Sequence, residues 1–104
     1  VVKEMLRDVP IPPGFDDTEL RRSTEPIGRF GLGVAVTGAV ACAWVERNDA
    51  AARDAMRDAR EWQVLQDMVA EGEWPKVLWE SADGWLAGTV DVERVRSTLG
   101  CDQR

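Results

Sequence analysis

The stretch from Phe30 to Val45 constrains the fold most strongly, because its sixteen residues, FGLGVAVTGAVACAWV, include no charged side chain. A helix that is apolar on every side lies either inside a protein core or inside a bilayer. A membrane span needs about 20 apolar residues, whereas sixteen helical residues reach only about 24 Å. We therefore predict that this stretch is the buried central helix of a small domain.

The composition of the same stretch also favours a core helix. Three of its sixteen residues are Gly and four are Ala, whereas membrane insertion is driven mainly by Leu, Ile, Phe and Val. Small residues allow neighbouring helices to approach closely, and this packing must offset about 0.5–1 kcal/mol for each interior Gly. A short membrane segment is the alternative interpretation.

The length, charge and residue usage exclude several classes of function. A chain of 104 residues is expected to form a single domain over 1–104. The net charge of −6 argues against a nucleic-acid or anionic-membrane surface. The chain has no His, which excludes Ser-His-Asp and Cys-His nucleophiles and His-containing zinc sites. We expect no enzyme, no cofactor and no metal.

The two cysteines are Cys42, in the apolar stretch, and Cys101, near the C-terminus. They would be buried thiols in a reducing cytosol and could pair outside it. Their positions favour pairing, because the C-terminal tail otherwise has little to hold it against the core. Closing a loop of about 60 residues removes unfolded-state entropy worth on the order of 4 kcal/mol. Free thiols are the alternative.

The N-terminal third is expected to lead into the central helix. Val1 to Val9 has apolar residues at helical spacing and predicts a short amphipathic helix. A Pro-rich connector over residues 10–16 follows, with Phe15 inserted into the core. Thr24-Glu25-Pro26 is typical of a helix start, so the central helix should cover about residues 26–47. Because the chain begins at Val1 and not at Met, we expect a trimmed piece with a signal peptide or anchor upstream.

The segment from Asp49 to about Glu71 is the most clearly amphipathic, with a break allowed near Arg60 to Trp62. Its apolar face consists of Ala52, Ala55, Met56, Ala59, Trp62, Leu65 and Val69.

Two further helices are predicted towards the C-terminus. One opens at Glu73-Trp74-Pro75 and stops at Gly84 or Gly88, with Trp85 and Leu86 in a separate turn. Another covers Val92 to Leu99, capped by Asp91 and ended by a left-handed Gly100. No segment alternates with a period of two beyond a few residues. The predicted fold class is therefore all-α, a small helical bundle around the Gly/Ala-rich helix.

Four tryptophans between positions 62 and 85 lie close in sequence to carboxylates. Exposed Trp rings beside carboxylates hold sugars in many proteins, and paired carboxylates about 5–9 Å apart hydrolyse glycosides. The alternative is core packing, because each Trp falls on the expected apolar face of its helix. The candidate ligand or partner surface consists of Trp74, Trp79, Trp85, Glu73 and Glu80.

The segments GLGVAVTGAVACAWVE, REW…LQDMV…EGEWPKVLWE and the terminal LGC give the chain a resemblance to a group of small uncharacterised actinobacterial proteins. Members of that group carry an N-terminal membrane anchor and expose a helical domain outside the cytoplasm. The resemblance covers about two-thirds of the chain, and its motifs are structural. It implies an extracytoplasmic location and a Cys42–Cys101 disulfide, and it implies no activity.

Three functions are consistent with these features. The first is a non-enzymatic, extracytoplasmic helical domain, tethered through the missing anchor, that binds a protein or a cell-envelope component. The second is a cytosolic acidic protein of the inhibitor or immunity type. The third is a carbohydrate-binding or carboxylate glycosidase module.

Overall fold

The computed structural model describes residues 6–15 and 29–101. Within these ranges the chain is helical and forms no strand, which confirms the all-α prediction. The helices are α3 (Arg29–Arg47), α4 (Ala50–Arg57), the 3₁₀-helix η1 (Asp58–Glu61), α5 (Gln63–Met68), α6 (Trp74–Ala87) and α7 (Val92–Thr98).

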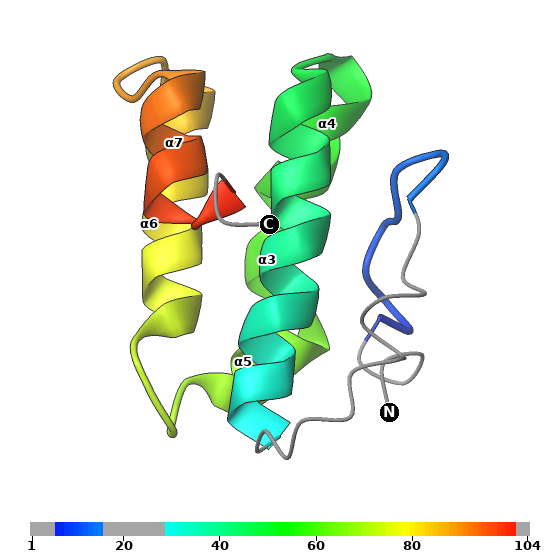
Figure 1. Cartoon of the computed structure of the whole chain (residues 1–104), viewed down its shortest axis with the longest axis vertical. Helices are drawn as coiled ribbons and strands as arrows, with labels where there is room; N and C mark the ends of the chain where they lie inside the picture. Colours follow the sequence, from blue (N-terminus) through cyan, green and yellow to red (C-terminus); the bar gives the residue numbers. More distant parts are fainter. Residues whose placement is uncertain (1–5, 16–28, 102–104) are drawn as a thin grey trace.

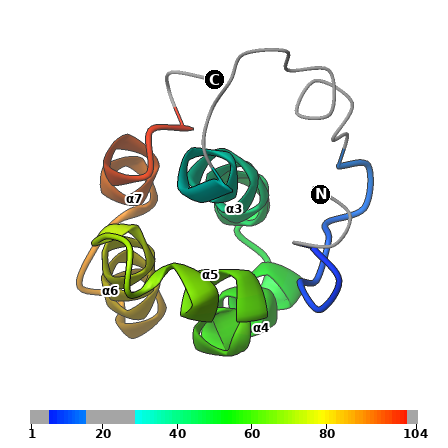
Figure 2. The ribbon, with the colours of Figure 1, turned by 90° about the horizontal axis from the view of Figure 1, so that it is seen from below.

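Helix α3 occupies the middle of the bundle and packs against α4, α5 and α7 (Figures 1 and 2). Its residues Val36, Val40, Ala41 and Val45 have no exposed surface. The helix ends at Arg47, as predicted, and the predicted start at residues 24–26 lies outside the described residues. The absence of a polar face therefore corresponds to a helix with neighbours on several sides.

One helix in the described part of the chain is long and apolar enough, by length and composition, to cross a membrane. This window, Phe30–Arg47, belongs to α3, and half of it is buried inside the fold. Core helices of soluble proteins pass the same test.

Gly33 of α3 lies directly against the Met68 side chain of α5. A Cβ atom added there would lie 2.6 Å from the Met68 sulfur. One turn later, the Thr37 hydroxyl donates to the Gly33 carbonyl oxygen at 2.6 Å and accepts the indole N–H of Trp74 at 2.9 Å. Thr37 is fully buried, and this pair of bonds satisfies a polar group inside the core.

The predicted amphipathic segment is divided into α4, η1 and α5. Asp49 caps α4 by accepting the Ala52 N–H at 2.8 Å. This bond lowers the pKa of the Asp49 carboxyl, and the Arg47 guanidinium lowers it further, whereas desolvation partly opposes both. The predicted core positions are buried as far as Leu65, but Val69 is 40% exposed. The prediction for Val69 was wrong because α5 ends at Met68.

Helices α6 and α7 form a hairpin beside α3 (Figure 1). Gly88 ends α6 in the left-handed conformation, with φ of 79°, and Asp91 caps α7 by accepting the Arg94 N–H. Helix α6 continues through Gly84, Trp85 and Leu86, so the separate turn predicted for the last two residues was wrong. Gly100 has the predicted positive φ, 75°, and leads directly to Cys101.

The N-terminal segment lies along the other side of the bundle. Residues 6–9 form a turn and not the predicted helix, whose first five residues lie outside the described part of the chain. Val9 is buried, and Phe15 packs half-buried against the core, as predicted for the connector. The bond from the Trp44 indole N–H to the Pro10 carbonyl oxygen, at 2.8 Å, ties this segment to α3.

Candidate binding site

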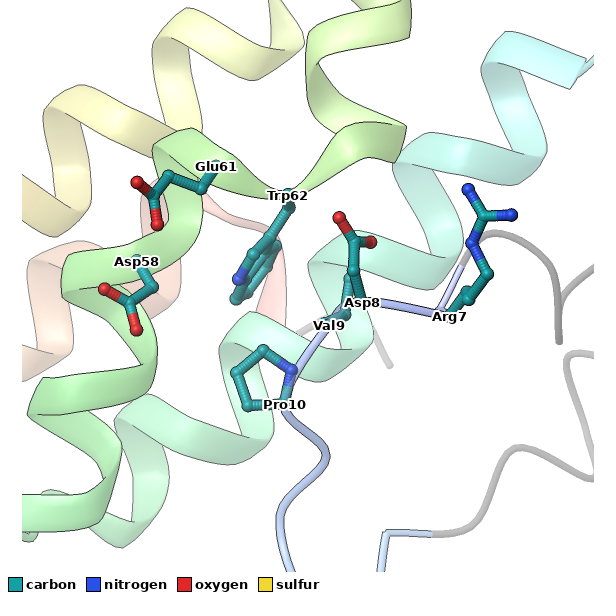
Figure 3. A pocket seen from close by; sticks show the side chains of 7 residues that line it. All are labelled: Arg7, Asp8, Val9, Pro10, Asp58, Glu61 and Trp62. Atoms are coloured by element: carbon teal, nitrogen blue, oxygen red, sulfur yellow. The ribbon is translucent and has the colours of Figure 1, made fainter.

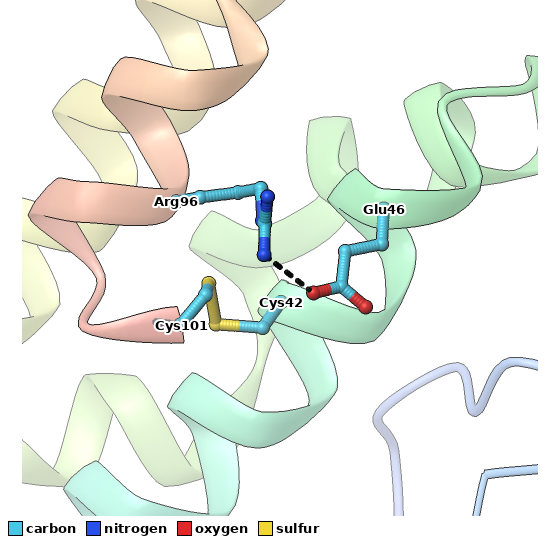
Figure 4. The surroundings of a disulfide bond; sticks show 4 residues. All are labelled: Cys42, Glu46, Arg96 and Cys101. Carbon is cyan, nitrogen blue, oxygen red and sulfur yellow. Dashed lines mark ion pairs between the residues drawn. A yellow bond between two sulfur atoms is a disulfide. The ribbon is translucent and has the colours of Figure 1, made fainter. Parts of the chain in front are cut away.

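The predicted disulfide between Cys42 and Cys101 is present (Figure 4). It joins the middle of α3 to the residue that follows Gly100, with a Cα–Cα distance of 5.7 Å across a sequence separation of 59. Above it, Arg96 of α7 pairs with Glu46 of α3 at 3.5 Å. These contacts hold the C-terminal end of the bundle against its central helix.

The predicted aromatic surface does not form as a single platform. Trp85 is only 3% exposed and belongs to the core, so its assignment to a ligand surface was wrong. The guanidinium of Arg53 lies over its ring, 5.1 Å from the ring centre. Trp85 follows Leu78 and Ala82 along the buried face of α6, and this periodicity explains its position.

Trp74 and Trp79 are half-buried and are both fixed by their indole nitrogens. Trp74 donates to Thr37, and Trp79 donates to the Ala59 carbonyl oxygen at 2.9 Å. Arg60 lies 5.6 Å from the ring centre of Trp79 and pairs with Asp83. Both indoles therefore link α6 to other helices through hydrogen bonds.

Glu73 and Glu80, the carboxylates of the predicted surface, are exposed. Glu73 precedes α6 without capping it through its side chain. Within the described residues neither carboxylate makes a hydrogen bond or ion pair. They remain a candidate partner surface, without a contact that joins them to a tryptophan.

A pocket of about 410 Å³ lies between the N-terminal segment and the end of α4 (Figure 3). Its lining consists of Arg7, Asp8, Val9, Pro10, Asp58, Glu61 and Trp62. The volume is within the range of about 300–1,000 Å³ typical of small-molecule sites. We call this cavity the N-terminal pocket.

Two hydrogen bonds from distant parts of the chain fix one wall of the N-terminal pocket. The Asp8 carboxylate accepts the Gln63 backbone N–H at 3.0 Å and so satisfies a free amide at the start of α5. The Pro10 carbonyl accepts the Trp44 indole N–H. Val9, between them, is buried, so this wall is built by both polar and apolar contacts.

The opposite wall comes from η1, where the chain changes direction between α4 and α5. Asp58 and Glu61 are three residues apart on this single turn, and both are exposed. In the described part of the chain, neither carboxylate has a hydrogen-bonding or ionic partner. Arg7 is likewise exposed, on the N-terminal side. The pocket thus carries three carboxylates and one guanidinium.

Trp62 lies between these walls and is 1% exposed. Its indole nitrogen is buried and has no hydrogen-bond partner, unlike those of Trp44, Trp74 and Trp79. Figure 3 shows this nitrogen on the ring edge turned toward Asp58 and Pro10. A buried donor without an acceptor costs about 1–3 kcal/mol, so an acceptor placed here would be bound favourably.

The lining residues do not form a metal site. Among the described residues, no group of three or more carboxylate or cysteine side chains is arranged to hold a metal ion.

The N-terminal pocket was not predicted from the sequence. Trp62 was predicted to lie on the apolar face of the amphipathic segment, and its burial confirms this. The missing information was the proximity of Asp8, which lies 55 residues from its partner Gln63. The only local sign in the sequence is the acidic Glu61 directly before the buried Trp62, which indicates that Trp62 lies at the edge of the core.

Comparisons with protein-family models, with curated proteins and with solved structures found no match for this chain.

Proposed function

We propose that this chain is an exported helical domain that binds a protein or a cell-envelope component and catalyses no reaction. The observation that carries the proposal is the Cys42–Cys101 disulfide. Disulfides persist in oxidising compartments and are rare in the cytosol, where thiol systems keep cysteines reduced. The resemblance to anchored actinobacterial proteins adds a membrane tether to the proposal.

A binding role is supported by the kinds of groups at the surface. The N-terminal pocket combines unpaired carboxylates with an unpaired indole donor, which are recognition groups. His-based nucleophiles are excluded by the composition of the whole chain.

The thiol state in the source cells tests the location. Cells are quenched in acid, denatured without reductant and treated with a maleimide mass tag, and the Cys42→Ser/Cys101→Ser variant is the untaggable control. We expect no tag before reduction and two tags after it. Two tags before reduction would overturn the proposal and favour the cytosolic inhibitor or immunity-type protein.

The tether is tested by fractionation of the same cells. A membrane-anchored protein remains in the pellet after a carbonate wash and is released by detergent, whereas a free exported protein appears in the medium. Recovery in the cytosolic fraction would contradict export.

The carbohydrate alternative has less support, because Trp85 lies in the core and the other two tryptophans are engaged through their indole nitrogens. Titration with a panel of cell-wall glycans, followed by tryptophan fluorescence, tests what remains of it. A saturable change that is lost in Trp79→Phe would support a sugar site on α6.

A further inference from the structure

We propose that the N-terminal pocket binds a cationic amide, in which an ammonium or guanidinium group is joined to an amide carbonyl, as in a Lys or Arg residue of a peptide. This inference rests on the proposed binding function and names the ligand class of its site. A basic residue of a protein partner and an amine-bearing peptide of the cell envelope share this chemistry.

The charge of the pocket selects a cation. Asp8, Asp58 and Glu61 contribute three negative charges against the single positive charge of Arg7. Asp58 and Glu61 have no ionic partner in the described part of the chain. Charge-assisted hydrogen bonds from an ammonium or guanidinium group to these carboxylates would be stronger than bonds between neutral groups.

The unpaired indole N–H of Trp62 favours a ligand that also carries a hydrogen-bond acceptor. An indole N–H only donates, so its partner must be an acceptor. A simple amine or metal ion offers none, whereas the carbonyl oxygen of an amide does. The nitrogen has less than 1 Å² of exposed surface, so we expect the ligand to widen the pocket on the Asp58 side as it binds.

The arrangement of the walls fits a ligand with both groups. The buried indole nitrogen lies on the ring edge turned toward Asp58 and Pro10, and Glu61 lies one turn after Asp58 in η1 (Figure 3). A carbonyl at the indole therefore brings its attached cation toward the two carboxylates of η1. The Asp8 carboxylate already accepts the Gln63 N–H at the start of α5. Asp58 and Glu61 are therefore the main cation-binding groups.

The experiment is an NMR titration of the intact, oxidised chain, with the indole N–H resonances as the readout. Nα-acetyl-lysine methylamide and Nα-acetyl-arginine methylamide are the probes. The uncharged norleucine analogue and butylamine, which lacks the carbonyl, are the matched controls. The Trp62→Phe variant assigns the Trp62 resonance.

We expect a saturable downfield shift of the Trp62 indole proton with the lysine or arginine probe. Butylamine should bind without that shift, and the norleucine analogue should bind at least about tenfold more weakly because it forms no charge-assisted bonds. Binding of the D probe would assign a cell-envelope peptide as the source, since a genetically encoded partner presents only L residues. Binding of either enantiomer supports the ligand class.

Two charge variants separate local recognition from the overall acidity of the chain. Asp58→Asn/Glu61→Gln should weaken binding of the lysine probe about tenfold. Glu73→Gln/Glu80→Gln removes the same charge from positions outside the pocket lining, one just before α6 and one on it. This variant should change binding less than about twofold, because charges that do not contact the ligand act on it only through screened solvent.

The inference is overturned if neither cationic probe shifts the Trp62 resonance, if the norleucine analogue binds equally well, or if both charge variants weaken binding equally. If one of these results is obtained while the Cys42–Cys101 pair is oxidised in cells, the proposed ligand class is wrong but the proposed export is still supported. Circular dichroism of each variant confirms that it is folded before it is titrated.

Discussion

Removal of the Cys42–Cys101 disulfide should lower the stability of this domain more than any other single change that leaves its packing intact. The two cysteines are 59 residues apart in sequence, and both are almost fully buried. Because the bond closes a long loop, its main effect in the chain-entropy model is to restrict the unfolded chain. The folded state should change little when it is removed.

The magnitude follows from the loop length. For a loop of about 60 residues, the entropy lost from the unfolded chain corresponds to about 4 kcal/mol at 25 °C. A domain of 104 residues has a total stability of about 5–15 kcal/mol. The disulfide therefore contributes at least about a quarter of the free energy of unfolding, and most of it if the total lies at the low end of this range. Its loss should lower Tm by about 15–30 °C.

The assay compares thermal unfolding of the oxidised chain with that of the reduced chain and of Cys42→Ala/Cys101→Ala, followed by far-ultraviolet circular dichroism. Urea unfolding at 25 °C gives the free energy directly. The alanine variant loses two buried sulfurs as well as the bond, so it should be slightly less stable than the reduced wild type.

A fully reduced protein that melts within about 5 °C of the oxidised one would refute the loop-entropy reasoning. A fall in Tm of the expected size with an unchanged far-ultraviolet spectrum at 20 °C would support it, because the helices would then be formed in both states.

Three further predictions concern individual contacts. Thr37→Val should lower the free energy of unfolding, measured by urea titration, by about 1–3 kcal/mol, because the Trp74 indole N–H loses its acceptor. In a Trp74→Phe background, where that N–H is absent, the same substitution should cost about 1 kcal/mol less. Gly88→Ala should lower the free energy of unfolding by about 1–2 kcal/mol, because residue 88 has a φ of 79° at the end of α6. Gly88→Asn should lower it less, since Asn tolerates the left-handed conformation better, and equal losses would contradict this explanation. The lowered pKa of Asp49 means that its carboxylate stabilises the fold above the ordinary value of 3.8, and that this contribution disappears as the pH falls through the lower folded-state pKa. Asp49→Asn keeps a capping side chain, so the stability difference from wild type should be larger at about pH 6 than at about pH 2.5, and a constant difference would exclude the titration.

Several features of this fold follow from residues that are close together in the chain. The uncharged stretch from Phe30 to Val45 has no face suited to water, and it forms the central helix α3. Asp49 and Asp91 cap the helices that follow them, and Gly100 ends the last helix, because these effects depend on backbone groups within one turn. The disulfide was favoured by the positions of its cysteines, with free thiols left open until the structure brought them together.

Other features depended on contacts between distant segments. Trp85 and Trp79 belong to one helix, yet the core buries the first and leaves part of the second exposed. The N-terminal pocket exists because Asp8 reaches Gln63 and because η1 turns the chain beside Trp62. Helical periodicity gives the direction of a side chain relative to its own helix, whereas burial and pocket formation depend on which other segment packs there. For this reason the tertiary structure alone located the candidate site.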